Sequence, residues 1–308
     1  MVKRLQNRIA QSRWALPITI IYGLVVCLTV ELMGYGQWMT FALLLVATLM
    51  MAELNNGYSL IRIYSRMVSC SFMVMITMSL TLFESVTVAV VMVAYIAFLL
   101  LIFRAYQNPG AVGWVFYAFV ALGISSIVFS KSLLFVPVLW VIMAVNVLCF
   151  SPRTLIASLL GIITPYWFVA AWLIYQGNIS YLGTHFLSAL QFGTPFQFSI
   201  LNIHQLLTFA FVLVLAVIGA VHFFLYSYQD RIRIRLMYET FVVLDACAVI
   251  FAILQPQYFD EMLGMSIVTT ATLIGHFLAL THSRLSNITM FVLAGVTLAL
   301  TIFNLWLD

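Results

Sequence analysis

The chain has 308 residues, a length that in a soluble protein would suggest two domains. Its composition excludes that class, because 65% of the residues are hydrophobic and only 7% are charged, whereas soluble proteins carry about 25% charged residues. The sequence therefore predicts an all-α, polytopic transmembrane helix bundle. The same composition and the net charge of only +4 exclude a nucleic-acid-binding protein, a disulfide scaffold and a disordered chain.

The N-terminal segment, residues 1–14, is basic and amphipathic. Val2, Leu5 and Ile9 recur at helical spacing among four Lys and Arg residues. This pattern predicts a short helix on the cytoplasmic leaflet, anchored by Trp14, with a disordered basic tail as the alternative. No small-residue cleavage site follows the first apolar run, which is therefore predicted to be a retained helix and not a signal peptide.

Residues 15–308 are predicted to form a single transmembrane domain. Eleven apolar segments have about the length that a spanning helix needs, and short connections make successive helices antiparallel neighbours. Two divisions are tight, at Glu84–Ser85 and at Ser130–Ser132, and the count falls by two if either hairpin does not cross. The predicted spans are 15–33, 38–54, 67–83, 86–103, 112–129, 133–150, 154–175, 206–228, 238–255, 265–282 and 288–306.

The basic residues test this count independently. With the N-terminus inside and the C-terminus outside, only Lys131 of the thirteen basic residues lies on the outer side. The positive-inside rule predicts this asymmetry, so the sequence indicates a multi-pass protein of a bacterial inner membrane. The twelve inner residues are Lys3, Arg4, Arg8, Arg13, Arg62, Arg66, Arg104, Arg153, Arg231, Arg233, Arg235 and Arg284.

The long outer segment, residues 176–205, contains no Lys, Arg, Asp or Glu and is rich in Phe, Tyr, Leu and Gly. We expect this apolar outer loop to lie on the membrane surface, because it cannot solvate itself well. It is predicted to form a helix over 181–190, followed by an extended stretch around Phe196 and Phe198. A lid over a lateral opening, a docking surface and a simple seal of the bundle are the three alternatives.

A few polar side chains lie deep in the predicted spans, where ionisable groups are costly and are functional candidates. At 1.5 Å per residue, Asp245, His276 and His222 lie about 9–10 Å, and Asn146 about 6 Å, from the inner ends of their spans. The sequence thus predicts a polar cluster in the inner half of the bundle. It is either a proton or substrate site or a hydrogen-bonded contact that holds packed helices together.

Asp245 and His276 are predicted to come within hydrogen-bonding reach. They lie in neighbouring spans, at nearly equal predicted depth, joined by a short outer connection. An unpaired carboxylate at that depth would cost several kcal/mol or stay protonated, so a partner is expected.

Metal and cofactor chemistry is not indicated. The four cysteines lie in or beside apolar segments without a CxxC motif and are typical of packing residues. The five histidines lie on both sides of the membrane and show no metal-ligand spacing. The sequence also lacks a nucleotide-binding loop and a GxSxG motif, so we predict no metal and no cofactor.

Three stretches carry a resemblance to a known family. They are ELNNGYSLIRIYSRMVSCSFMVM at 53–75, YQNPGAVGWVFYAFVALGISSIVFSKSLLFVPVLWVIMAVN at 106–146 and SPRTLIASLLGIITPYW at 151–167. Together they resemble an uncharacterised family of polytopic inner-membrane proteins from Bacteroidota. The resemblance implies a location and a topology. It implies no catalytic residue, because that family has no assigned activity.

Three functions are compatible with these features. The first is a non-enzymatic assembly or scaffold protein of the cell envelope, with the bilayer and another envelope protein as partners. The second is a transporter or flippase that uses the Asp/His cluster, with a lipid-like molecule among the candidate substrates. The third is a lipid-modifying enzyme, which we rank last because the predicted outer face has no arginine to bind a diphosphate.

Overall fold

The computed structural model of the protein describes residues 4–32 and 38–306. The regular structure of this part of the chain is helical, without a strand, which confirms the predicted fold class. The contacts group into two compact units. Unit 1 comprises Met1–Ala89 and Phe196–Asp308, and unit 2 comprises Val90–Pro195. The grouping does not test the prediction of a single transmembrane domain, which stays a prediction.

Seven helices in the described ranges are long and apolar enough to cross a membrane, and four shorter apolar helices accompany them. Each of the eleven coincides with one predicted span. The chain is thus a helical integral membrane protein, whereas the count of eleven crossings stays a prediction. The long helices are Trp38–Tyr58, Val86–Ala105, Pro152–Tyr175, Ile203–Gln229, Ile232–Leu254, Pro256–Leu280 and Arg284–Trp306, and the shorter ones are Ala15–Thr29, Met67–Met78, Val112–Val128 and Ser130–Val145.

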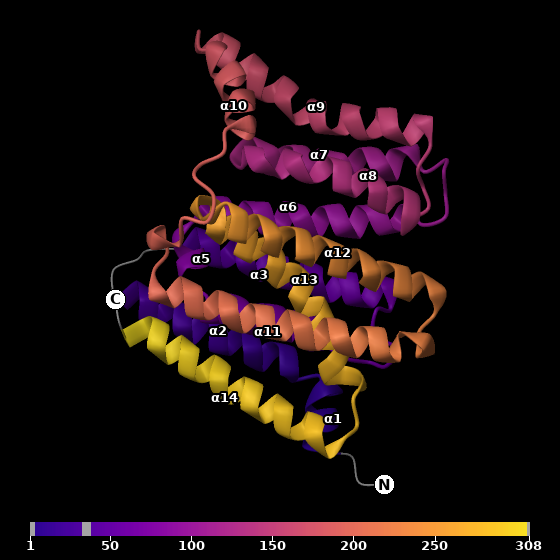
Figure 1. The fold of residues 1–308 in the computed structure, drawn as a ribbon, viewed down its shortest axis with the longest axis vertical. Helices are drawn as coiled ribbons and strands as arrows, with labels where there is room; N and C mark the ends of the chain where they lie inside the picture. The colour runs from indigo at the N-terminus through magenta and orange to yellow at the C-terminus, as the bar shows by residue number, and fades with distance from the viewer. Residues whose placement is uncertain (1–3, 33–37, 307–308) are drawn as a thin grey trace. The chain divides into compact units, whose positions relative to one another are not determined.

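Unit 1 is a helical bundle in which α4, α11 and α12 pack against α13. Figure 1 shows α11 and α12 beside α13. Helices α2 and α3 pack on α4, and α14 contacts α4 and α11. The helices of this unit are α1 (Leu5–Ala10), α2 (Ala15–Leu32), α3 (Trp38–Tyr58), α4 (Met67–Met78), α5 (Thr81–Glu84), α11 (Ile203–Tyr226), α12 (Ile232–Leu254), α13 (Phe259–Leu280) and α14 (Arg284–Trp306).

The two ends of unit 1 differ in charge. At the end that we call the basic end, Arg62 Nη2 donates to Gln229 Oε1 at 2.7 Å, and Arg4 donates to the carbonyl of His282. At the opposite, acidic end, Gln205 Nε2 donates to Asp260 Oδ1 at 3.0 Å. The N-terminal helix α1 contacts the basic end, and α14 finishes at the acidic end.

Glycine allows α11 and α13 to approach closely. A Cβ added to Gly219 of α11 would lie 2.7 Å from the carbonyl carbon of Leu273 in α13. Small residues at such contacts are typical of membrane helices, because close backbone approach maximises van der Waals packing. The same contact brings the next turn of α11, with His222, against His276.

Helix α1 is shorter than predicted, and its polar side faces the protein. Gln6 Nε2 donates to the Leu278 carbonyl and to Thr281 Oγ1, both at 2.8 Å. Leu5 and Ile9 are exposed instead. This orientation suits a helix whose apolar side meets lipid, although the surface-helix prediction itself is not tested and its first residues, 1–3, lie outside the described residues.

Unit 2 centres on the packing of α7 against α9. A Cβ on Gly161 of α9 would lie 2.5 Å from the carbonyl oxygen of Phe116 in α7, so only glycine allows this approach. The helices of this unit are α6 (Val86–Ile102, which begins in unit 1), η1 (Phe103–Ala105), α7 (Val112–Val128), η2 (Ser130–Phe135), α8 (Val136–Val145), α9 (Pro152–Tyr175) and α10 (Ser180–Leu190).

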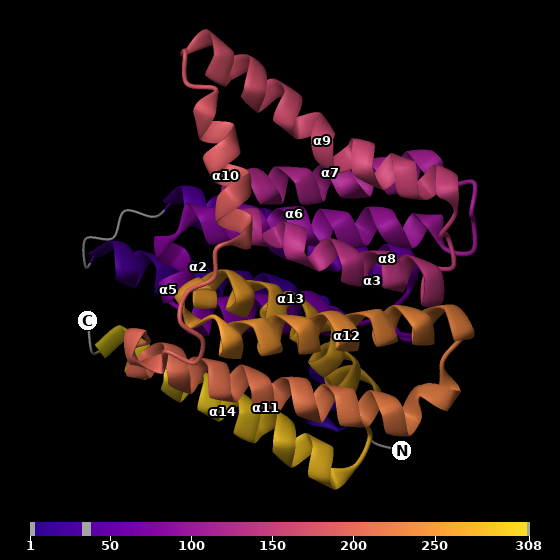
Figure 2. The same cartoon turned by 45° about the horizontal axis from the view of Figure 1, so that its top comes forward.

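The apolar outer loop contains α10, which confirms the predicted helix over 181–190. Figure 2 shows α9 and α10 diverging from the turn that joins them. Lys131 fixes the end of α10, because its buried Nζ donates to the carbonyls of Ser188 at 2.6 Å, Ala189 at 3.2 Å and Gln191. The stretch around Phe196 and Phe198 is not extended as predicted. Phe196 has a φ of 59°, and Phe198 starts the short 3-10 helix η3 (Phe198–Ile200).

Candidate functional site: a polar column along α13

Helix α13 contributes to three groups of polar side chains in unit 1. All of its residues from Met262 to His276 are buried. Three groups of polar side chains follow one another along it: Asp260 and its neighbours at the acidic end, Asp245 with three hydroxyls in the middle, and His276 with His222 and Asp230 near the basic end. We call these three groups the α13 column.

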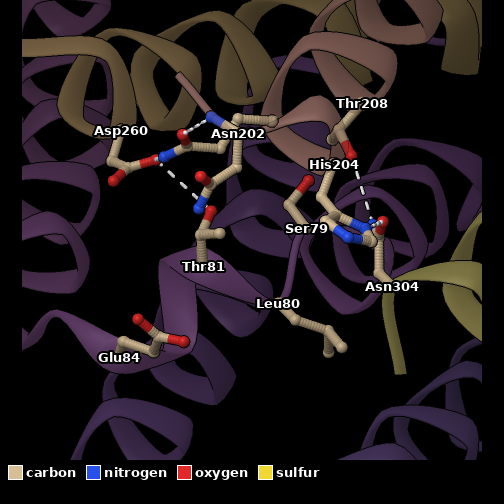
Figure 3. Close-up of a pocket in the computed structure, with 10 residues that line it drawn as sticks. Ser79, Leu80, Thr81, Glu84, Asn202, His204, Thr208, Asp260 and Asn304 are labelled. Atoms are coloured by element: carbon tan, nitrogen blue, oxygen red, sulfur yellow. Dashed lines mark hydrogen bonds between the residues drawn. The ribbon is translucent and has the colours of Figure 1, made fainter. Parts of the chain in front are cut away.

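The first group lines a pocket of about 130 Å³ at the acidic end (Figure 3). Asp260 Oδ1 accepts hydrogen bonds from Gln205 Nε2 at 3.0 Å and from Thr81 Oγ1 at 3.3 Å, which joins α13 to α11 and α5. Polar side chains dominate the wall, and Leu80 is its one apolar member. The ten lining residues are Ser79, Leu80, Thr81, Glu84, Asn202, His204, Gln205, Thr208, Asp260 and Asn304.

The second group surrounds Asp245, a buried residue of α12. Its Oδ1 accepts from three hydroxyls of α13: Ser266 at 2.8 Å, Thr269 at 2.7 Å and Thr270 at 3.1 Å. All three partners are neutral, so they satisfy hydrogen bonds of the carboxyl group without supplying a counter-charge. A buried carboxyl group of this kind must take up a proton or a cation to become neutral.

The hydroxyl of Thr269 has more acceptors than hydrogens. It lies 2.7 Å from Asp245 Oδ1 and also 2.9 Å from the carbonyl oxygen of Ser266. A hydroxyl has one hydrogen and can also accept. If it donates to the carbonyl, as Ser and Thr commonly do within helices, the contact with Asp245 is a hydrogen bond only when the carboxyl group is the donor. The geometry therefore accommodates both an ionised and a protonated Asp245.

The third group is a chain of three ionisable side chains near the basic end. His276 Nε2 lies 3.0 Å from Asp230 Oδ2, and His276 Nδ1 lies 3.3 Å from His222 Nδ1. The side chains of His276 and Asp230 are only 1% and 4% exposed. Asp230 precedes α12, His276 is on α13 and His222 is on α11, so the chain joins three segments.

This chain can hold an extra proton by reversing one hydrogen bond. A carboxylate only accepts, so His276 Nε2 carries a hydrogen toward Asp230. When His276 is neutral, its Nδ1 accepts from His222. When His276 is protonated, its Nδ1 donates to His222 instead. The same three side chains thus stay bonded in both states.

An aromatic wall encloses His276. The centroid of the Tyr238 ring lies 4.7 Å from the centroid of the imidazole, and that of the Phe223 ring lies 6.2 Å from it. Both rings meet the imidazole edge-on. The Tyr238 hydroxyl is buried and has no hydrogen-bond partner among the described residues.

The three groups together cover much of a membrane's thickness. At 1.5 Å per residue, about 14 Å of helix separates Asp260 from Thr269, and about 10 Å separates Thr269 from His276. The total of about 24 Å compares with about 30 Å for the hydrocarbon core of a bilayer.

The predicted Asp245–His276 hydrogen bond is wrong. Asp245 bonds to hydroxyls that lie six to ten positions before His276 in α13, whereas His276 bonds to Asp230 and His222. The error came from the helix ends. Helix α12 begins at Ile232, before the predicted start at 238, because Arg and Glu residues continue it beyond its apolar part. Asp245 therefore lies about 20 Å from the start of α12, whereas His276 lies about 6 Å from the end of α13.

The structure brings His222 and His276 together and places Asp245 in a separate group. Asn146 follows α8 in unit 2, so its membership of the cluster stays a prediction. The sequence reasoning missed Asp230, because it lies in a loop. One feature of the sequence could have singled out Asp230: it is the only acidic residue in the basic segment QDRIRIR.

No cluster of three or more His, Cys, Asp or Glu side chains in residues 4–32 and 38–306 could hold a metal ion. The ionisable side chains of the column can exchange protons, and its oxygen atoms can accept hydrogen bonds from a ligand. Comparison of the chain with protein-family models, curated proteins and solved structures finds no match. The resemblance to a Bacteroidota family therefore stays a prediction.

Proposed function

We propose that the protein is a proton-coupled transporter and that protons pass along the α13 column of unit 1. The observation that supports this proposal most strongly is the environment of Asp245. Its buried carboxyl group lies in the middle of a spanning helix and is hydrogen-bonded to three hydroxyls. Its neutral surroundings make proton uptake the simplest way to remove the charge. The Thr269 hydroxyl can serve the carboxyl group in either state.

The other two groups of the column support the same function. Asp260 gives the column an ionisable group beside a pocket at the acidic end. The Asp230–His276–His222 chain gives it a group near the basic end that retains its contacts with or without an extra proton. The distances between the three groups of the column are longer than one hydrogen bond, so water molecules or a movement of the helices must connect the groups.

The proposal includes the predicted topology: eleven crossings of a bacterial inner membrane, with the N-terminus inside and the C-terminus outside. The coincidence of eleven apolar helices with the predicted spans supports it, and so does the asymmetry of the basic residues. The acidic end of unit 1 then faces outward. The scaffold and the lipid-modifying enzyme stay predictions, since exposed apolar side chains occur on any bundle in lipid and favour neither.

Charge displacement tests the proposal. Liposomes that contain the purified protein are adsorbed on a solid-supported membrane and exposed to a rapid proton-concentration jump. We expect a transient current that protein-free liposomes lack. Asp245→Asn retains an oxygen that accepts from the three hydroxyls but cannot titrate, so it should lose most of this current.

Two controls separate proton transfer from folding. Asp245→Asn should elute as a monodisperse peak and unfold near the wild-type temperature, because interhelical hydrogen bonds in membranes contribute only about 0.6 kcal/mol on average. Glu53→Gln makes the same chemical change at an exposed position of α3 and should retain the current. An absent wild-type current, or equal currents in the wild type and Asp245→Asn, would overturn the proposal.

A further inference from the structure

Several of the polar side chains that line the pocket at the acidic end already donate their hydrogens within the protein. The Ser79 hydroxyl donates to the Met75 carbonyl at 2.9 Å. Thr81 Oγ1 and Gln205 Nε2 both donate to Asp260 Oδ1. Since a hydroxyl has a single hydrogen, Ser79 and Thr81 present lone pairs to the pocket.

The hydrogen bonds of Asn304 fix the state of His204. Asn304 Nδ2 donates to the Met78 carbonyl at 2.7 Å and to Thr208 Oγ1 at 3.2 Å, which orients the amide. Its Oδ1 then faces His204 Nδ1 at 3.1 Å (Figure 3). An amide oxygen accepts, so Nδ1 carries the hydrogen and the neutral imidazole has Nε2 as its acceptor.

The charges at the pocket have one sign. Its lining includes the carboxyl groups of Glu84 and Asp260 and no Lys or Arg. Asp260 is partly buried and accepts hydrogen bonds from two neutral side chains, Thr81 and Gln205. A cation in the pocket would be attracted to its carboxyl group, and an N–H donor would suit the acceptor atoms of His204, Ser79 and Thr81.

We infer that this pocket binds a small cation with N–H donors, namely ammonium or a small primary amine. Its carboxylate, hydroxyl and imidazole atoms can accept hydrogen bonds from the hydrogens of an ammonium group. The volume of about 130 Å³ has room for several water molecules, or for a ligand with a few heavy atoms in their place. Hard alkali ions are less suited, because they prefer a shell of oxygen ligands to an imidazole nitrogen.

Naming this cation as the transported substrate rests on the proposed function, whereas its binding does not. Under the proposed topology, the pocket opens toward the outer side and lies about 14 Å along α13 from Thr269. A cation bound beside Asp260 would then occupy the first group of the column, and a proton would occupy the second.

Direct binding tests the inference. Purified full-length protein on scintillation beads is titrated with radiolabelled methylammonium at constant ionic strength. We expect saturable binding that ammonium chloride displaces and that the same concentration of sodium chloride does not. Asp260→Asn keeps an oxygen for Thr81 and Gln205 but lacks the charge. It should weaken binding about tenfold or more, as the loss of a charged hydrogen-bond partner does.

A second variant tests whether weaker binding comes from the loss of a ligand contact and not from misfolding. His204→Phe removes the Nε2 acceptor and should also weaken methylammonium binding, whereas Glu53→Gln, at an exposed position of α3, should bind as the wild type does. Absent saturable binding, equal displacement by sodium, or unchanged binding in folded Asp260→Asn and His204→Phe would each overturn the inference. Methylammonium binding without proton-driven current would sustain the site and reject the proposed function, and the converse result would reject the site alone.

Discussion

The contact between α11 and α13 makes a sharp prediction for Gly219→Ala. The added Cβ would lie 2.7 Å from the carbonyl carbon and the Cβ of Leu273, and 2.9 Å from the backbone nitrogen of Ile274. Carbon atoms normally approach to about 3.5–4.0 Å. Backbone atoms cannot rotate away, so the two helices must separate by about 1 Å.

The magnitude follows from two opposing effects. Overpacking at a close contact costs about 1–3 kcal/mol, whereas replacing glycine by alanine within a helix favours the helix by about 1 kcal/mol in water. Gly295→Ala is the matched control, because an added Cβ in α14 would meet no atom within 4 Å. We expect Gly219→Ala to unfold at a lower temperature than the wild type, and Gly295→Ala at an equal or higher one.

Thermal unfolding in detergent, followed by the loss of the monodisperse gel-filtration peak, measures this difference. The separation should also lengthen the 3.3 Å contact between His222 and His276, one turn along the same interface. Gly219→Ala should therefore reduce the proton-driven current as well as the stability. Equal unfolding temperatures for Gly219→Ala and Gly295→Ala would refute the reasoning about close packing.

Three further predictions concern the other contacts. Lys131→Met removes the ammonium group that binds the end of α10. Protease added to intact spheroplasts should therefore cleave residues 176–205 of this variant faster than those of the wild type, which we expect to be cleaved slowly. Equal cleavage rates would show that Lys131 does not hold the loop. Gln6→Ala removes two hydrogen bonds to the α13–α14 turn and should cost about 1–3 kcal/mol, seen as a lower unfolding temperature; an unchanged one would contradict the docking of α1. A periplasmic reporter fused after Asp308 should be active, whereas a reporter active only in the cytoplasm would mean an even number of crossings.

The helices were predictable because spans of a membrane must be apolar and long. Each predicted span coincides with a helix, and α10 lies where the sequence indicated. The helix ends were less predictable, since charged residues at the start of α12 continue the helix without adding to the hydropathy. That shift moved Asp245 away from His276 and made the predicted pair wrong.

The candidate site was predictable only in part. Depth along the spans placed His222 beside His276, because α11 and α13 run in the same direction and both residues lie about 6 Å from the C-terminal ends of their helices. The partners of Asp245 were missed because Ser and Thr in membrane helices are too common to single out. Asp230 was missed because only the fold shows that this loop residue is buried.

Infrared difference spectroscopy tests most directly the central claim that Asp245 binds a proton inside the membrane domain. Spectra of the reconstituted protein are recorded between acidic and alkaline buffers, for the wild type and for Asp245→Asn. The proposal predicts a carbonyl band of a protonated carboxylic acid that changes between the two buffers and that Asp245→Asn abolishes. Identical difference spectra for the wild type and Asp245→Asn would contradict the claim.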